Sequence, residues 1–179
     1  MIIFFDRDGV LVPSLEINGK PKPSFKLNDN IDKKISNRLS KLKKNSCYMF
    51  LVTNQPDIKR GLKDKKELIK ENDYIVKKLK IDDWAMCEHD NLDNCDCRKP
   101  KIGMYKKLLK KWNLSLKNHK SYMLGDRVSD MIAGKEVGCF NIFIDHNYIE
   151  TKGFKDYDQC FNDTNLALDF IIKSNKLNK

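Results

Sequence analysis

Apolar runs and helix-periodic stretches alternate along this chain of 179 residues. Five apolar runs have the length of buried strands and end at polar or turn-forming residues. They are residues 1–5, 47–53, 84–88, 121–125 and 140–145. Because strands buried on both faces read as nearly continuous apolar runs, these five runs predict a parallel sheet.

Segments with apolar residues three or four positions apart separate these runs, and this spacing predicts helices. The predicted helices are residues 32–42, 64–80, 103–112, 128–138 and 165–172. Their expected apolar positions include Ile35, Leu39, Leu42, Leu68, Ile75, Val76, Leu79, Met104, Leu108 and Trp112. Asn28 to Asn30 are candidate caps for the first helix.

The alternation of strands and helices predicts an α/β fold. We expect a Rossmann-like, doubly wound parallel sheet with helices on both faces, because strands joined by helices run parallel. The pattern contains no internal repeat and no linker. We therefore expect a single domain over residues 1–173 and a flexible tail over 174–179.

Polar residues end several of the predicted strands, at the edge where ligands bind in such sheets. Asp6 follows the first strand, Thr53 and Asn54 end the second, and Asp126 follows the fourth. The stretch 16–25 contains an Asn-Gly turn signal, which predicts a small hairpin flap over this edge and no large cap. We expect the functional site here.

Composition narrows the class of protein. The chain has 40% hydrophobic residues, 34% charged residues and a formal charge of +10. Its lysines are spread over the polar faces of the predicted helices, so we expect no nucleic-acid partner, with a basic binding face as the alternative. No apolar run approaches the ~20 residues of a membrane span, and charged residues follow the first strand at once, so we expect a cytoplasmic protein without membrane contact.

Asp6 and Asp8 lie at the tip of the first predicted strand, directly before Gly9. This D-x-D-G fragment also occurs in EF-hand calcium loops. That alternative fails because the later ligand positions hold Val10 and Ile17, and because a strand precedes the motif. A plain Asp/Gly turn stays open for the motif taken alone.

Three cysteines and one histidine lie within residues 87–97. Cys87, His89, Cys95 and Cys97 have the types and number of ligands of a closed, structural zinc site with no position for water. A reactive or merely buried cysteine cluster is the alternative. A nucleic-acid zinc module would need a recognition helix or stacking aromatic residues beside it, and the loop has neither.

Four motifs occur in a fixed order along the chain: FFDRDGV, LVTNQ, RKPK and GDRVSD. Together they resemble the haloacid dehalogenase superfamily of phosphotransferases over nearly the whole chain. The resemblance implies that Asp6 is a nucleophile forming an aspartyl-phosphate and that Asp8 is the general acid and base. It also implies Thr53 and Lys99 as catalytic residues that contact the phosphate oxygens.

The same resemblance implies a Mg²⁺ ion held by Asp6, Asp126 and the backbone carbonyl of Asp8. Asp130 would orient Lys99 or a water on the metal. The expected substrate contacts are Asp6, Asp8, Thr53, Asn54, Gln55, Arg98, Lys99 and Arg127.

The loop pattern C-x-H…C-x-C-R-K-P is similar to one branch of that superfamily, the zinc-loop phosphatases of heptose 1,7-bisphosphate and histidinol phosphate. TNQPDIKRG and RKPKIGM favour the heptose side, whereas the short Cys/His loop and Arg127 also occur on the histidinol side. We therefore predict a monomeric, Mg²⁺-dependent phosphomonoesterase that removes the 7-phosphate of D-glycero-D-manno-heptose 1,7-bisphosphate, a phosphorylated sugar of surface-glycan synthesis. A histidinol-phosphate phosphatase, a nucleic-acid 3′-phosphatase and a catalytically silent binding protein stay open.

Overall fold

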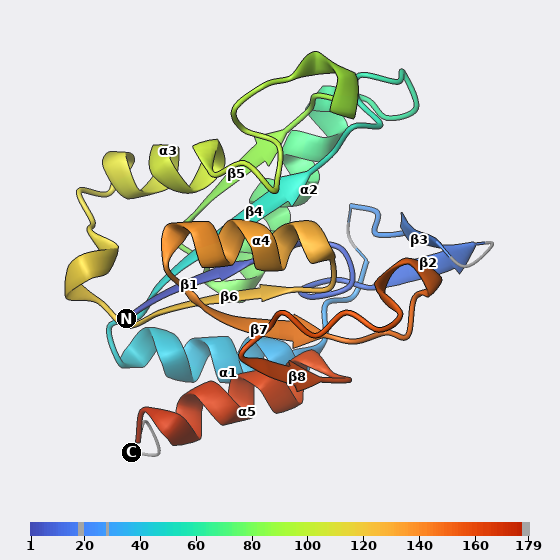
Figure 1. Cartoon of the computed structure of the whole chain (residues 1–179). Helices are drawn as coiled ribbons and strands as arrows, with labels where there is room; N and C mark the ends of the chain where they lie inside the picture. Colours follow the sequence, from blue (N-terminus) through green and yellow to red (C-terminus); the bar gives the residue numbers. More distant parts are fainter. Residues whose placement is uncertain (18–19, 28, 177–179) are drawn as a thin grey trace.

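A six-stranded sheet forms the centre of the fold (Figure 1). The computed structural model describes residues 1–17, 20–27 and 29–176. The strands are β1 (Ile2–Phe5), β4 (Tyr48–Asn54), β5 (Asp83–Cys87), β6 (Ser121–Gly125), β7 (Phe140–Ile144) and β8 (Gln159–Phe161). All neighbours pair in parallel, in the order β5-β4-β1-β6-β7-β8. The chain changes direction across the sheet at β1, which is the point where ligands bind in sheets of this kind.

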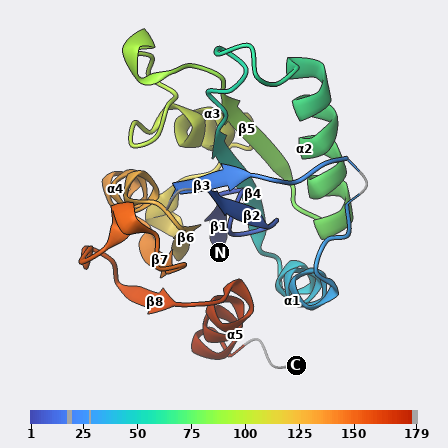
Figure 2. The same ribbon diagram turned by 90° about the vertical axis from the view of Figure 1, so that its right-hand side faces the viewer.

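Helices cover both faces of the sheet (Figure 2). On one face lie α1 (Lys33–Lys44), α2 (Lys65–Leu79) and α5 (Thr164–Ser174), and on the other lie α3 (Gly103–Lys111) and α4 (Val128–Val137). Strand β1 shows why, because its successive side chains point to opposite faces. Ile3 and Phe5 pack with the first set of helices, whereas Ile2 and Phe4 pack with the second. The prediction of a doubly wound α/β fold is confirmed.

Three helices begin at an aspartate that accepts a hydrogen bond from a backbone amide of the first turn. Asp32 accepts from the amide of Lys34 at 2.8 Å, and Asp64 accepts from the amide of Glu67 at 2.9 Å. Asp163 caps α5 and accepts from the amide of Asn165 at 2.6 Å. The prediction of a cap for α1 at Asn28 to Asn30 was wrong, because the chain stays non-helical through residue 32. Asn28 itself lies outside the described residues.

The structure differs from the predicted elements in two further places. Strand β8 was missed, because it has only three residues and none of them is fully buried. Trp112 was expected in the core, and it lies half-buried against the core, one residue after α3 ends, with its indole Nε1 donating to Asp83 at 2.8 Å. Tyr105 is buried in the core on that helix instead. Val76 is only half-buried.

The predicted flap is a hairpin between β1 and α1. Strands β2 (Ser14–Ile17) and β3 (Lys20–Pro23) pair antiparallel, and Figure 1 shows them beyond the carboxyl ends of the central strands. The predicted turn at residues 18–19 lies outside the described residues. At the other terminus, α5 includes Ser174, the first residue of the predicted tail, and residues 177–179 lie outside the described residues. No helix in the described part of the chain has the length and apolar character needed to cross a bilayer.

Candidate active site

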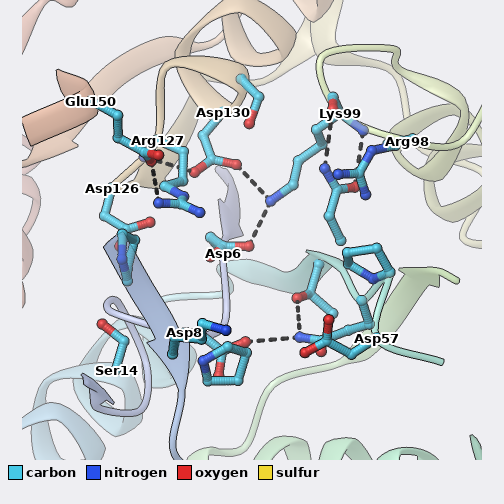
Figure 3. A pocket seen from close by; sticks show the side chains of 18 of the residues that line it. Asp6, Asp8, Ser14, Asp57, Arg98, Lys99, Asp126, Arg127, Asp130 and Glu150 are labelled. Atoms are coloured by element: carbon cyan, nitrogen blue, oxygen red, sulfur yellow. Dashed lines mark hydrogen bonds and ion pairs between the residues drawn. The ribbon is translucent and has the colours of Figure 1, made fainter. Parts of the chain in front are cut away.

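Asp6, Lys99 and Asp130 form a buried ionic cluster at the carboxyl edge of the sheet (Figure 3). Lys99 Nζ lies 2.6 Å from Asp6 Oδ1 and 2.6 Å from Asp130 Oδ1, and it donates to the carbonyl oxygen of Val52 at 2.8 Å. Asp6 comes from the end of β1, Lys99 from the loop after β5, and Asp130 from α4. Three segments far apart in sequence therefore meet at one ammonium group.

The carboxylates at this edge carry unusual pKa values. Burial raises the pKa of Asp6 to about 6, and the nearby Asp130 and Asp8 add to the rise, while the Lys99 ammonium opposes it. Burial also raises the pKa of Asp126 well above its ordinary value, with Asp6 and Asp130 adding to the effect. One lysine does not balance this much negative charge, which favours a further cation in the cluster.

Asp126 has the features of a ligand for a hard cation. Its Oδ1 is buried and has no hydrogen-bond partner among the described residues. Oxygens of Asp6, Asp126 and Asp130 lie within 4.8 Å of one another, and carboxylate oxygens are the ligands that Mg²⁺ prefers. Asp130 Oδ1 already lies against Lys99, and its Oδ2 accepts from the amide of Arg127 at 3.1 Å. The residues present fit a Mg²⁺ ion, with Asp6 and Asp126 as the available carboxylates.

Gly9 allows Asp126 to approach the loop after β1. Its φ is +82°, and a Cβ atom at this position would lie 2.2 Å from Asp126 Oδ2. Both the backbone conformation and the space therefore require glycine. This explains in physical terms why glycine follows the two aspartates of the first motif.

Asp8 lines the same cavity and is held from two sides. Gln55 Nε2 lies 2.8 Å from Asp8 Oδ2 and 3.0 Å from Thr53 Oγ1, which links the ends of β1 and β4. Arg7 makes the second contact, with Nε 3.0 Å from Asp8 Oδ2. The motifs in the sequence gave no sign of this contact from Arg7.

Asn54 and Arg98 hold the loop that carries Lys99. The Asn54 side-chain nitrogen Nδ2 donates to the Lys99 carbonyl oxygen at 3.0 Å, and its side-chain oxygen Oδ1 accepts from the Lys99 backbone amide at 3.0 Å. Arg98 Nη1 donates to the carbonyl oxygen of His89 at 3.1 Å. The position of the Lys99 ammonium thus depends on both β4 and the Cys/His loop.

The four predicted zinc ligands lie together directly after β5. Sulfur–sulfur distances are 3.2 Å for Cys87–Cys97, 3.5 Å for Cys95–Cys97 and 3.7 Å for Cys87–Cys95, and His89 Nδ1 is 3.3 Å from Cys97 Sγ. Tetrahedral zinc with Zn–S bonds of about 2.3 Å requires sulfur–sulfur separations of about 3.8 Å. The cluster is compatible with zinc in both size and ligand type.

The site opens into a cavity of about 370 Å³. Its lining residues outside the predicted set are Ser14, Pro21, Lys22, Pro23, Pro56, Asp57, Arg60, Ser129 and Glu150. Glu150 forms an ion pair with Arg127, as Figure 3 shows. Arg60 belongs to the TNQPDIKRG motif, so the sequence could have identified it as a residue that lines the cavity. Glu150 belongs to no motif.

A family model described as polynucleotide kinase 3 phosphatase matches residues 1–174. The chain belongs to this family. The resemblance inferred from the four motifs is therefore confirmed. The matched residues include all four motifs and the Cys/His loop.

The relatives of this chain include named phosphatases. D-glycero-alpha-D-manno-heptose-1,7-bisphosphate 7-phosphatase of Campylobacter jejuni is 36% identical over 138 residues, which cover 74% of each chain. The histidine biosynthesis bifunctional protein HisB of Blochmanniella floridana is 31% identical over 151 residues, and the match covers 79% of this chain but 40% of that protein.

The solved structure of D,D-heptose 1,7-bisphosphate phosphatase from B. bronchiseptica, complexed with magnesium and phosphate, has a TM-score of 0.76 to this chain. It is 21% identical, and the match covers 97% of this chain and 98% of that one. At this identity the comparison shows the fold.

Proposed function

We propose that this chain is a Mg²⁺-dependent phosphomonoesterase that removes the 7-phosphate of D-glycero-D-manno-heptose 1,7-bisphosphate. The observation that carries the proposal is the buried Asp6–Lys99 pair beside the unpartnered oxygen of Asp126, at the base of a cavity. A carboxylate nucleophile next to a cation site suits an anionic phosphate ester, whose repulsion must be neutralised. The similarity to the Campylobacter jejuni heptose phosphatase favours the substrate.

The Mg²⁺ ion would be held by Asp6, Asp126 and the backbone carbonyl of Asp8. When bound, it would neutralise charge on the phosphate and on the clustered carboxylates. Asp130 is assigned to Lys99 rather than to the metal, because its Oδ1 lies 2.6 Å from the ammonium. This arrangement keeps Lys99 protonated, since both neighbouring carboxylates raise its pKa against the effect of burial.

The reaction has two steps. In the first, an oxygen of Asp6 bonds to phosphorus while the ester P–O bond breaks, and the departing oxygen takes its electron pair and a proton from Asp8. The products are an alcohol and an aspartyl-phosphate. In the second, the oxygen of a water molecule bonds to phosphorus while the P–O bond to Asp6 breaks, and Asp8 takes a proton from the water. This step releases inorganic phosphate and restores Asp6.

Residues around the cavity would bind the substrate. Thr53 and Lys99 are assigned to the transferred phosphate, where hydrogen bonds and a positive charge stabilise the transition state. The further contacts assigned are Asn54, Gln55, Arg98 and Arg127, all of which line the cavity. Arginines at the rim are suited to a second phosphate, because the guanidinium fork matches phosphate oxygens.

The Cys/His loop is proposed to hold structural Zn²⁺ through Cys87, His89, Cys95 and Cys97. Its role would be to place Arg98 and Lys99, since a loop without regular structure needs another source of order. We also propose one domain over residues 1–173, a monomer, and a cytoplasmic location, where three metal-binding thiols stay reduced. Size-exclusion chromatography with light scattering tests the monomer, which has a mass of 21.0 kDa.

Histidinol phosphate is the second candidate substrate. The similarity to HisB favours it, but this chain spans only 40% of that bifunctional protein, against 74% of the heptose phosphatase. The name of the matching family keeps a nucleic-acid 3′-phosphatase as an alternative to test. A silent binding protein is the least favoured alternative, because Asp6, Asp8, Lys99 and Asp126 are all present.

The test is phosphate release with Mg²⁺ from both anomers of heptose 1,7-bisphosphate, from histidinol phosphate and from a 3′-phosphorylated oligonucleotide. We expect release of one phosphate from the heptose at a kcat/KM at least about 100-fold above the other two, as expected when a site recognises a second anionic group. Asp6→Asn is the control and should release none. Preference for histidinol phosphate or the oligonucleotide would replace the heptose assignment, and no release from any of them would exclude all three substrates.

A further inference from the structure

Arg7 separates the two aspartates of the first motif and is fully buried, with 0% of its surface exposed. All three guanidinium nitrogens have partners. Nε and Nη2 lie 3.0 and 3.1 Å from the two oxygens of Asp8, and Nη1 lies 3.2 Å from Glu71 and 3.3 Å from Asn72. The side chain therefore joins Asp8 to helix α2 on the far side of the loop.

Glu71 and Asn72 interrupt the apolar face of α2. This helix otherwise buries Leu68, Ile75 and Leu79 against the sheet, and the two polar residues occupy the position between them. A buried carboxylate and a buried amide need partners, because an unpaired polar group in the core is costly. Arg7 is a partner of both, and Lys63 Nζ also lies 3.4 Å from Glu71.

A buried ion pair is weak evidence for stability, because its replacement by well-packed apolar residues is often neutral or stabilising. The cluster of Arg7, Glu71 and Asn72 has one particular effect. Two nitrogens of the Arg7 guanidinium, Nε and Nη2, hold the two oxygens of Asp8. Gln55 adds a third donor to the same carboxylate at 2.8 Å.

We propose that Arg7, held in place by Glu71 and Asn72, is a positioning residue that orients the Asp8 carboxyl group for proton transfer to the departing alcohol oxygen. The inference rests on the proposed role of Asp8 as general acid. Asp8 stands on a loop, and its side chain is 14% exposed at the cavity. Without Arg7 its carboxylate can rotate away from the ester oxygen, and misplacement of a reacting group by about 1 Å can cost about 100-fold in rate.

The loop itself does not need the Arg7 side chain. The backbone carbonyl of Arg7 accepts hydrogen bonds from the amides of Leu11 at 3.0 Å and Val12 at 3.1 Å, and these bonds are independent of the side chain. A substitution at Arg7 therefore tests the contact with Asp8 more than the path of the backbone.

The experiment compares two leaving groups, because a general acid matters most for a poor one. We would measure kcat/KM for the aliphatic phosphomonoester that the wild type hydrolyses best and for p-nitrophenyl phosphate. Arg7→Met should lower kcat/KM for the aliphatic ester about 10- to 100-fold and that for the aryl ester less than about threefold. Arg38→Met is the matched control, since it breaks the Arg38–Asp169 pair between α1 and α5 and should change neither value.

Asp8→Asn decides whether Arg7 acts through Asp8. In that background Arg7→Met should cause no further selective loss, because two residues that act as a unit are not additive. If Arg7→Met does not fold, Arg7→Lys carries the same test, since it keeps the buried charge but not the two-nitrogen contact. We expect an intermediate loss with the same preference for the aliphatic ester.

Equal losses for both esters, or losses that add to those of Asp8→Asn, would overturn the inference while leaving the proposed function intact. An Asp8→Asn variant without any leaving-group preference would remove the acid role of Asp8 and the inference with it. A wild type inactive on both esters would contradict the proposed function first.

Discussion

At the scale of single residues, the site is defined by buried carboxylates that lie close to one another. Asp6 and Asp126 both have raised pKa values, with burial as the main cause, and Lys99 lies within 2.6 Å of Asp6. Such a cluster is unfavourable without a further cation. Single substitutions can therefore test the balance of charge among these side chains and the space available around them.

Stability of the metal-free protein should depend on pH through Asp6. Its pKa rises from 3.8 to about 6 on folding, so the folded state binds more protons than the unfolded state between these values. Stability is therefore lost as pH rises through this window. Asp6→Asn cannot ionise, so relative to the wild type in EDTA it should gain about 1–3 kcal/mol in free energy of unfolding between pH 4 and pH 7.5. Urea unfolding measures this gain; a difference independent of pH would contradict the assignment.

Substitution of Gly9 should damage the metal site specifically. Gly9→Ala places a Cβ 2.2 Å from Asp126 Oδ2, so we expect loss of the thermal stabilisation by Mg²⁺ and a drop in kcat/KM of about 100-fold or more. Gly138→Ala is the matched control. Gly138 has a similar φ of +84°, but a Cβ added there would meet no atom within 4 Å. It should lose about 1 kcal/mol through backbone strain alone and keep its response to Mg²⁺.

At the scale of elements, the Cys/His loop depends on its neighbours for position. Arg60, from the loop after β4, pairs with Asp90 through two contacts of 2.6 and 2.8 Å. Asn54 at the end of β4 pairs with the backbone of Lys99. The position of the Cys/His loop therefore determines where Lys99 lies in the site.

Zinc removal should lower stability and activity together. Cys95→Ser removes one of four ligands, so the purified variant should lose its zinc, melt at least about 5 °C lower and lose about 10- to 100-fold in kcat/KM. Metal analysis, thermal unfolding and phosphate release measure the three effects. Cys160→Ser is the control, because Cys160 lies outside the cluster, and it should keep zinc and activity. A wild type that is fully active without zinc would contradict the structural role.

At the scale of the whole molecule, the core joins the two ends of the chain. Leu168 and Ile171 of α5 belong to the same buried cluster as Ile3 of β1 and Leu39 of α1. A cluster with members this far apart in sequence is expected to form or melt as one unit. This is the physical basis for proposing one domain over residues 1–173.

A chain that ends before α5 should therefore unfold throughout. Trp84 belongs to β5, and Trp112 directly follows α3. Both lie toward the edge of the sheet opposite β8 and α5, so their fluorescence reports on that distant region. We expect truncation at residue 162 to abolish the folded tryptophan fluorescence together with the helical circular dichroism. In the full chain both signals should give the same melting curve. A truncated chain with wild-type fluorescence would show two independent units.

Prediction from the sequence worked where the local signal was strong. The long apolar runs of β1, β4 and β6 identified the central strands, and polar residues at their ends identified the edge that holds the site. It failed for β8, because a three-residue strand at the sheet edge has little apolar pattern of its own. It also missed Arg7 and Glu150, since only the packing of distant segments shows which polar side chains are buried or line a cavity.

The sequence by itself determined the α/β alternation, the four motifs and the four metal-binding side chains after β5, because these depend on periodicity and on residue type at short spacing. Only the tertiary structure decided which charges meet: Lys99 between Asp6 and Asp130, and Arg7 between Asp8 and α2. The reason is physical. Pairing energies depend on distance and burial, and both are set by which segments the sheet brings side by side.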